Sequence, residues 1–178
     1  MPETLENIAI SHSQSLILKA QKGDEKAFTK LLGLWFKRIY NFSLKYFGDH
    51  DLAMEATQKT FIAMHKSIAR LKDPDSFRNW LYKIALNQCR EEDRKNRQRS
   101  WQSTFENTEA AAVEEVVHNP ERQYQRLEKE EMLSEMLLNL PEAQRVVVIM
   151  KEYEGMKFRE IAMALDISEN TAKSRLYY

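Results

Sequence analysis

Basic and amide side chains recur at helical spacing over residues 75–99, where the sequence reads DSFRNWLYKIALNQCREEDRKNRQR. Steps of three or four residues place Lys83, Asn87 and Arg90 on one face of a helix, and Arg94 continues that face. Lysine and arginine neutralise phosphate groups, and asparagine can hydrogen-bond to the edge of a base. These residue types predict contact with a polyanion. A solvated helix end that binds nothing is the alternative.

A second group of polar side chains lies near the C-terminus, in KFREIAMALDISENTAKSRLYY. The spacing predicts a helix-turn-helix in which Ile161 and Leu165 face inward and Ser168 caps the second helix. Asp166 stands in the turn, where glycine is preferred and aspartate is tolerated better than most residues. The outward residues of the second helix suit phosphates and base edges. They are Asn170, Thr171, Lys173, Ser174, Arg175, Tyr177 and Tyr178. A helical hairpin with a solvated polar face is the alternative.

The elements that must position the first group are helices. Apolar residues recur every three or four positions over residues 15–47, with a break before Asp24, and again from about 49 to 68. This spacing is typical of amphipathic helices. Asp24 is the expected cap of the helix after the break, and Asp49 or Asp51 is the expected cap of the next helix.

A third helix is predicted after Pro74, because proline disfavours helical geometry in the residue before it. Asp75 or Ser76 can cap this helix. Its buried face is predicted to hold Phe77, Trp80, Leu81, Ile84, Ala85 and Gln88. The basic and amide residues of the first group then lie on a different face of the same helix.

Composition favours an all-α fold of two small helical domains. The 178 residues include four glycines and four prolines, with 43% hydrophobic and 30% charged residues, which is typical of a soluble helical protein. Helical periodicity fails after about residue 98 and returns from about residue 121. In this second periodic region, Pro141 is expected to separate two helices and Gly155 to end the second of them. We therefore predict a domain of three to four helices over 1–97, a flexible acidic linker over 98–120 and a second domain over 121–178.

The net charge of zero conceals a separation of charge along the chain. Residues 66–100 hold ten basic and five acidic residues, whereas residues 101–142 hold three basic and ten acidic residues. A local basic patch attracts a polyanion whatever the total charge. The acidic stretch either imitates nucleic acid or keeps a linker soluble, and in both cases we expect it to weaken DNA binding by the free protein.

Several classes of protein are disfavoured by what the sequence lacks. Cys89 is the single cysteine, and the four histidines stand without cysteine or carboxylate partners at ligand spacing, so no metal is expected. No apolar run approaches the roughly 18 residues of a membrane span, and the N-terminus lacks a signal-peptide layout, so we expect a cytoplasmic location without membrane insertion. No nucleophile with a base and no glycine-rich phosphate loop can be assembled, which predicts a protein that is not an enzyme and needs no cofactor.

Three stretches stand in the order and spacing of one family: GDHDLAMEATQKTFIAMHKSI, SFRNWLYKIALNQCREEDRK and LPEAQRVVVIMKEYEGMKFREIAMALDISENTAKSRL. Together they resemble a bacterial RNA polymerase sigma factor of the extracytoplasmic-function (ECF) type, in the sigma-70 superfamily. The resemblance covers the chain from about residue 20 to the C-terminus. It implies a transcription initiation factor with a promoter-melting sigma-two domain and a helix-turn-helix sigma-four domain. The implied partners are core RNA polymerase, promoter DNA and a sequestering anti-sigma factor.

The resemblance also implies roles for individual residues in promoter binding. The third helix and the loop before it would bind the minus-ten element, where the loop captures a base flipped out of the duplex. The residues implied there are Lys72, Asp73, Ser76, Lys83, Asn87, Arg90 and Arg94. At the minus-thirty-five element, the outward residues of the helix-turn-helix would be joined by Lys151 as a phosphate contact. Arg175 is the expected base reader, with an ion pair to Glu160 as the alternative.

Core RNA polymerase is expected to dock on the second long helix. The residues implied by the resemblance are Asp51, Glu55, Gln58, Thr60 and Phe61. Phe61 is equally suited to core packing, and Met54 and Lys59 stand where the family often carries acids. The charge complementarity of this surface therefore differs from the usual pattern.

Two other functions fit the same residues. A DNA-binding regulator would join the helix-turn-helix to a helical sensing domain around an apolar pocket, and a helical protein-interaction module would bind no DNA. The sequence also ends at Tyr178, about three turns into the second helix of the helix-turn-helix, from which we expect a truncated C-terminus.

Overall fold

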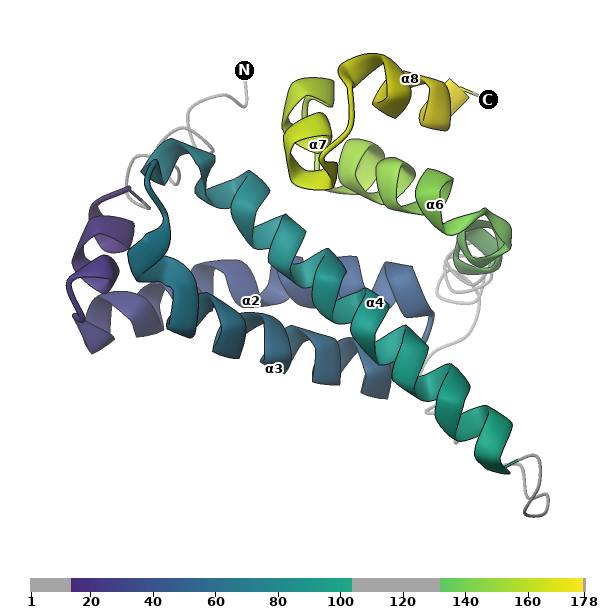
Figure 1. Ribbon diagram of the computed structural model, residues 1–178, viewed down its shortest axis with the longest axis horizontal. Coiled ribbons are helices and arrows are strands. Elements are labelled where there is room, and N and C mark those ends of the chain that lie inside the picture. The colour runs from purple at the N-terminus through teal and green to yellow at the C-terminus, as the bar shows by residue number, and fades with distance from the viewer. Residues whose placement is uncertain (1–13, 104–131, 178) are drawn as a thin grey trace, which may run out of the picture.

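The computed structural model describes residues 14–103 and 132–177, and over these ranges its regular elements are helices without a strand (Figure 1). This confirms the predicted all-α class. The described residues form a helical domain on each side of residues 104–131, so most of the predicted linker lies outside them. Helix α4 (Phe77–Ser103) continues past the predicted boundary at residue 97.

The first domain is a bundle of α2 (Glu25–Phe47), α3 (His50–Ser67) and α4, preceded by helical residues 14–21. The sequence signals for the starts of α2 and α3 are confirmed, with Asp49 as the cap of α3 in place of the alternative Asp51. Asp24 caps α2 by accepting a hydrogen bond from the Ala27 backbone N–H at 3.0 Å, and Asp49 caps α3 by accepting one from Leu52 at 2.8 Å. Each carboxylate satisfies a backbone donor that the helix itself leaves unpaired.

Two short 3-10 turns, η1 (Ile68–Arg70) and η2 (Pro74–Ser76), connect α3 to α4. Asp73 is the N-cap of η2, because its carboxylate accepts a hydrogen bond from the Asp75 backbone N–H at 3.0 Å. The prediction of Asp75 or Ser76 was wrong because η2 runs directly into α4. The first unpaired N–H groups therefore belong to the 3-10 turn and not to α4.

The buried face of α4 is wider than the predicted stripe. Phe77, Leu81 and Ala85 are buried as predicted, whereas Trp80, Ile84 and Gln88 are only partly buried. The buried residues that the prediction omitted are the apolar Tyr82, Leu86 and Cys89, together with the acidic Glu92. The reason is that α4 packs against the first domain on one side and against the second domain on another.

The second domain begins with helical residues 132–139 and continues through α6 (Glu142–Val148), the π-helical turn η3 (Ile149–Tyr153), α7 (Phe158–Leu165) and α8 (Glu169–Tyr177). Gly155 follows η3 with a φ of 63°, which confirms its predicted role as a helix terminator. Asp166 joins α7 to α8 with φ 53° and ψ 46°, the left-handed geometry expected at the turn.

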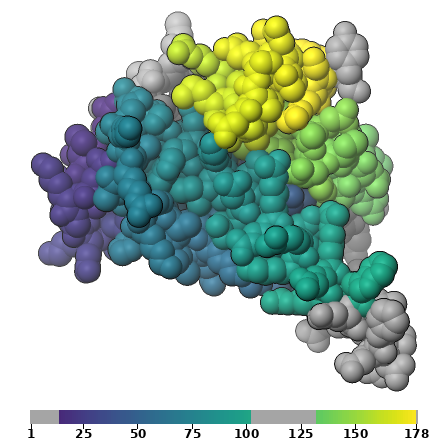
Figure 2. All heavy atoms as spheres, viewed as in Figure 1, coloured from purple at the N-terminus to yellow at the C-terminus, as the bar shows by residue number. Residues whose placement is uncertain are grey.

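The two domains pack directly against each other. Helix α7 contacts α4, and η3 contacts α2; the second domain lies along α4 in both views (Figures 1 and 2). The buried apolar residues form one cluster that includes Tyr46 and Tyr82 from the first domain and Val146 and Met150 from the second. The relative position of the domains is therefore fixed by a shared core.

None of the helices described here is both long enough and apolar enough to span a membrane.

Candidate nucleic-acid interface

The predicted cationic face of α4 exists, but half of it is occupied. Asn87, Arg90 and Arg94 are exposed, and Lys83 is partly buried. Lys83 forms an ion pair with Asp166, and Arg90 Nε lies 2.9 Å from Glu142 Oε1. Both acids belong to the second domain. The predicted minus-ten residues of α4 therefore share one helix, and two of them are paired with acidic side chains of the other domain.

The loop before α4 is held by hydrogen bonds at both ends. Gln21 Nε2 donates to the backbone carbonyls of Ile68 and Leu71 at 3.1 and 2.6 Å. Ser76 Oγ donates to the Asp73 backbone carbonyl at 2.7 Å, and the Asp73 carboxylate caps η2. Lys72 is exposed. Of the three residues predicted to bind DNA in this loop, Asp73 and Ser76 therefore support the loop itself, and Lys72 is available to a ligand.

Helix α8 presents most of the predicted minus-thirty-five residues. Ser168 caps it as predicted, because its Oγ accepts from the Thr171 backbone N–H at 3.0 Å. Ala172 is buried against the rest of the domain. Of the predicted residues on α8, Asn170, Lys173, Ser174 and Tyr177 are exposed, and Thr171 and Arg175 are partly buried. Tyr178 lies outside the described residues.

Lys151 joins this surface from an earlier element. Its Nζ lies 5.0 Å from the centroid of the Phe158 ring, and Nζ of Lys173 lies 5.9 Å from the same centroid. A cation over an aromatic face is attracted by the negative charge density of the ring. The structure therefore brings together two lysines that the sequence separates.

The predicted polymerase-docking residues divide into a surface group and a core group. Asp51 and Gln58 are exposed and Glu55 is partly buried. Thr60 and Phe61 have only 0% and 5% of their surface exposed, so neither is presented to a partner in this structure. Phe61 stacks on Phe36, with ring centroids 5.9 Å apart. This contact supports core packing, the alternative role given to Phe61 in the sequence analysis.

Two exposed apolar side chains on α3 were not predicted as contacts: Met54 was noted only for standing where the family often carries an acid, and Ile62 was not noted. Met54 is 37% exposed and Ile62 is 54% exposed. Each lies four positions from Gln58, so all three share one face of the helix. A large exposed apolar pair beside polar residues is typical of a protein-binding surface. Their spacing of four residues from Gln58 is the feature of the sequence that could have predicted them.

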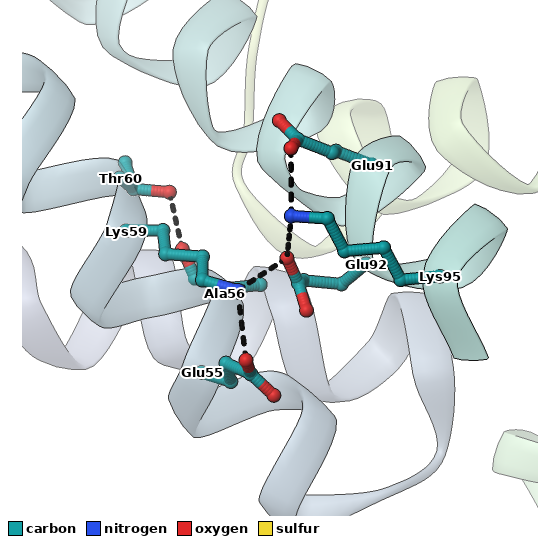
Figure 3. A network of polar contacts seen from close by, with 7 residues as sticks. All are labelled: Glu55, Ala56, Lys59, Thr60, Glu91, Glu92 and Lys95. Atoms are coloured by element: carbon teal, nitrogen blue, oxygen red, sulfur yellow. Dashed lines mark hydrogen bonds and ion pairs between the residues drawn. The ribbon is translucent and has the colours of Figure 1, made fainter. Parts of the chain in front are cut away.

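A chain of ion pairs joins α3 to α4 behind this surface (Figure 3). The buried carboxylate of Glu92 contacts Lys59 at 2.5 Å and Lys95 at 3.4 Å. Lys59 also contacts Glu55 at 2.7 Å, and Lys95 contacts Glu91 at 2.7 Å. The five charges alternate in sign along the chain. Glu92 is 1% exposed, and such a carboxylate is tolerated only when cations neutralise it.

The pKa values in this chain shift in the direction that favours the charged forms. The hydrogen bond from Lys59 lowers the pKa of Glu55, and partial burial opposes this effect. Burial alone would lower the pKa of Lys59, but hydrogen bonds to Glu55 and Glu92 outweigh it, so the pKa of Lys59 rises. Both groups are therefore charged at neutral pH.

The described residues contain no cluster of histidine, cysteine and acidic side chains arranged to hold a metal ion. Cys89 is buried, and burial raises the pKa of its thiol to about 12. A thiol in that state is a poor nucleophile and a poor metal ligand.

Two family models match the two domains separately. The model for sigma-70 region 2 matches residues 34–99, and the model for sigma-70 region 4 matches residues 130–177. These matches place the bundle with α4 and the helix-turn-helix in one class of helical, promoter-directed transcription factors. The chain belongs to the sigma-70 family of RNA polymerase sigma factors, and within that family it is of the ECF type.

Relatives along nearly the whole chain agree with this assignment. The ECF RNA polymerase sigma-E factor of Haemophilus influenzae is 26% identical over 169 residues, covering 92% of this chain and 89% of the relative. The RNA polymerase sigma-H factor of Pseudomonas aeruginosa is also 26% identical over 169 residues, covering 92% and 88%. The family consists of transcription initiation factors that are not catalytic by themselves.

Solved structures share the fold. The structure of CnrH in complex with the cytosolic domain of CnrY matches with a TM-score of 0.69 at 22% identity, over 93% of this chain and 90% of that one. The sigma factor RpoE in complex with the anti-sigma factor NepR from Bartonella quintana matches with a TM-score of 0.65 at 20% identity, over 85% and 90%. Both comparisons cover the two domains together.

Proposed function

We propose that this chain binds core RNA polymerase in the cytoplasm, directs it to a subset of promoters and helps to melt the minus-ten region. The observation that carries this proposal is the pairing of two cationic helices, α4 and α8, on the two domains that match sigma-70 regions 2 and 4. One helix per domain provides one contact for each promoter element.

At the minus-ten element, Asn87 is the proposed base contact and Lys83, Arg90 and Arg94 are the proposed phosphate contacts. The amide of asparagine offers a donor and an acceptor to a base edge, whereas a cation neutralises any phosphate. Lys72 is the proposed cation of the loop that holds the extruded base. A pocket for that base offsets part of the cost of unstacking it, so melting requires no cofactor.

At the minus-thirty-five element, α8 is proposed to enter the major groove. Asn170, Lys173 and Arg175 are the proposed contacts, with Lys151 beside them. The capped N-terminus of the helix carries partial positive charge and favours phosphate. Arg175 has the forked geometry that matches the two acceptors of guanine, so it is the proposed base reader.

The proposed docking surface for core polymerase lies on α3. It consists of Asp51, Glu55 and Gln58, extended by the exposed apolar side chains of Met54 and Ile62. Thr60 and Phe61 are proposed to act only by packing beneath this surface. An apolar centre with a polar rim is the usual arrangement of a protein-binding surface.

An anti-sigma factor is a further proposed partner. Both solved structures described above are complexes of such a fold with a second protein, and one of these proteins is described as an anti-sigma factor.

Run-off transcription with purified core polymerase and a promoter library tests the proposal. We expect a defined subset of templates to be transcribed only when the chain is present. Asn87→Ala should change the preference among minus-ten bases, whereas Arg94→Ala should weaken all promoters alike and reduce the salt slope by about one. Absence of transcription from every template, with no co-purification of polymerase, would refute the proposed function.

A further inference from the structure

Phe158, the first residue of α7, lies against side chains of two neighbouring elements in the second domain. Its ring centroid is 5.0 Å from Nζ of Lys151 on η3 and 5.9 Å from Nζ of Lys173 on α8. The ring of Tyr177, also on α8, has its centroid 6.4 Å from that of Phe158. Helix α7 contacts both η3 and α8. The separate parts of the proposed minus-thirty-five surface therefore meet at one aromatic ring, to which the sequence reasoning gave no role.

The two lysines at this ring keep their positive charge available. Among the residues that the structure describes, neither Lys151 nor Lys173 forms an ion pair with a carboxylate. Lys83 and Arg90 on α4, by contrast, are paired with acids. An aromatic face attracts a cation through the charge distribution of the ring and adds no net negative charge. The ring of Phe158 can therefore hold both ammonium groups and still leave them to neutralise phosphates.

Two lysines that bind neighbouring phosphates normally incur a cost. Their like charges repel each other, and each long side chain loses rotamer freedom when a ligand fixes it. A ring that already orders both side chains in the free chain reduces the ordering that remains to be done on binding. An aromatic support for Lys151 and Lys173 is therefore expected to raise affinity for DNA without any contact of its own with DNA.

Phe158 is anchored firmly enough to give that support. It is partly buried and packs against the hydrophobic core. The start of α7 beside it is fixed, because the Lys157 backbone N–H donates to Glu160 Oε2 at 2.7 Å. Lys173 is exposed and Lys151 is partly buried, so the lysines are the more accessible members of the group. A side chain locked by packing can orient flexible neighbours.

We propose that Phe158 is a positioning residue for DNA binding, whose ring holds Lys151 and Lys173 as a clamp for two phosphates of the minus-thirty-five backbone. This inference rests on the proposed function of α8 as the minus-thirty-five helix. Phosphates carry no sequence information, so the clamp strengthens binding to every sequence alike. Base preference stays with Arg175.

Nuclear magnetic resonance of the free chain tests the geometry directly, because protons above an aromatic ring are shifted upfield by its ring current. In a sample with isotope-labelled lysine, we expect the ε-methylene protons of Lys151 and Lys173 to resonate upfield of those of Lys26, which is exposed. Phe158→Leu should return both signals to the position of Lys26. Absence of the upfield shift for either lysine in the unchanged chain would overturn the proposal.

Binding of promoter fragments by the chain assembled with core polymerase tests the consequence for DNA. Phe158→Leu should weaken binding about threefold on every minus-thirty-five variant, which is the size expected when exposed cation–π contacts are lost. Phe158→Tyr keeps an aromatic face and should bind within about twofold of the unchanged chain. Lys151→Ala with Lys173→Ala should reduce the salt slope by about two.

The double lysine variant is also the background that separates positioning from folding. In that background, Phe158→Leu should change affinity by less than about twofold, because the ring has no cation left to hold. An equal loss in both backgrounds would show that the ring acts only by packing and would overturn the proposal. So would full DNA affinity of Phe158→Leu in the otherwise unchanged chain. If run-off transcription still depends on the chain in either case, the proposed function stands and the clamp alone is wrong.

Discussion

The carboxylate of Glu92 lies 2.5 Å from the ammonium group of Lys59 and thereby ties α4, the proposed minus-ten helix, to α3, the proposed polymerase-docking helix. Glu92 is 1% exposed, whereas the Lys59 side chain is 33% exposed. Removal of Lys59 is therefore expected to cost more stability than removal of Glu92. Loss of Lys59 leaves a buried carboxylate with Lys95 at 3.4 Å as its nearest described cation, and loss of Glu92 leaves a lysine that can turn to water.

Lys59→Met is expected to lower the free energy of unfolding by about 2 to 3 kcal/mol, because it leaves the charge of Glu92 largely uncompensated inside the bundle. The double variant Lys59→Met with Glu92→Met should be more stable than Lys59→Met alone, since it removes the stranded charge. Urea denaturation measures both. Lys66→Met, at an exposed position near the end of α3, is the control and should change stability by at most about 0.5 kcal/mol. A double variant less stable than the single one would contradict this account of Glu92.

The pKa of Glu55 leads to a second prediction. Its folded pKa is lowered by the hydrogen bond from Lys59, so the ionised form is favoured in the folded state. Stability from this group is present above the unfolded pKa near 4.5 and is lost as pH falls through the folded pKa. The stability difference between the unchanged chain and Glu55→Gln should therefore be largest near neutral pH and vanish in acid. Urea titrations at a series of pH values measure it, and a difference that grows in acid would contradict the sign.

Local signals explain what the sequence predicted well. Asp24, Asp49 and Ser168 were identified as caps from their own neighbourhoods, because a cap depends on a side chain and a backbone group only a few residues apart. Asp166 was placed in left-handed geometry for the same reason. Family resemblance then supplied the order of the two domains.

Tertiary contacts explain what the sequence did not predict. The burial of Thr60 and Tyr82 depends on which helices lie opposite them, and periodicity in one helix does not specify that. The ion pair between Lys83 and Asp166 joins residues of two domains that were expected to be separated by a flexible linker. No local pattern carries that information.

The turn before α8 gives a third prediction. Asp166 has a φ of 53°, where a side chain with a Cβ costs free energy that glycine avoids. Asp166→Ala should therefore be less stable than Asp166→Gly by about 1 kcal/mol. Both variants remove the ion pair to Lys83, so their difference isolates the backbone. Thermal unfolding of both variants measures it, and equal midpoints would show that the turn relaxes.

Cys89 gives a fourth prediction. Its thiol is buried, its pKa is raised to about 12 by burial, and its Sγ lies 3.6 Å from Ser43 Oγ. The folded chain should not react with Ellman's reagent near pH 8, whereas the chain unfolded in guanidinium should release one equivalent of thiolate product, because the thiolate is the reactive form. Cys89 is the single cysteine, so the absorbance reports on this residue alone. Rapid reaction of the folded chain would show that α4 opens locally.

The fifth prediction concerns how α8 reads DNA. Arg175 is partly buried on α8, and the Glu160 carboxylate accepts a hydrogen bond from the Lys157 backbone N–H at 2.7 Å, which commits that acid to capping α7. Arg175→Lys replaces a planar fork by a point charge, so it should lower discrimination at one minus-thirty-five base by about 1 to 3 kcal/mol. Lys173→Ala, an exposed neighbour, should instead weaken binding to all sequences alike and reduce the salt slope by about one. Binding to a library of minus-thirty-five variants, together with the thermal midpoint of each protein, separates the two roles. A loss of stability in Arg175→Lys without a change in base preference would assign Arg175 to structure.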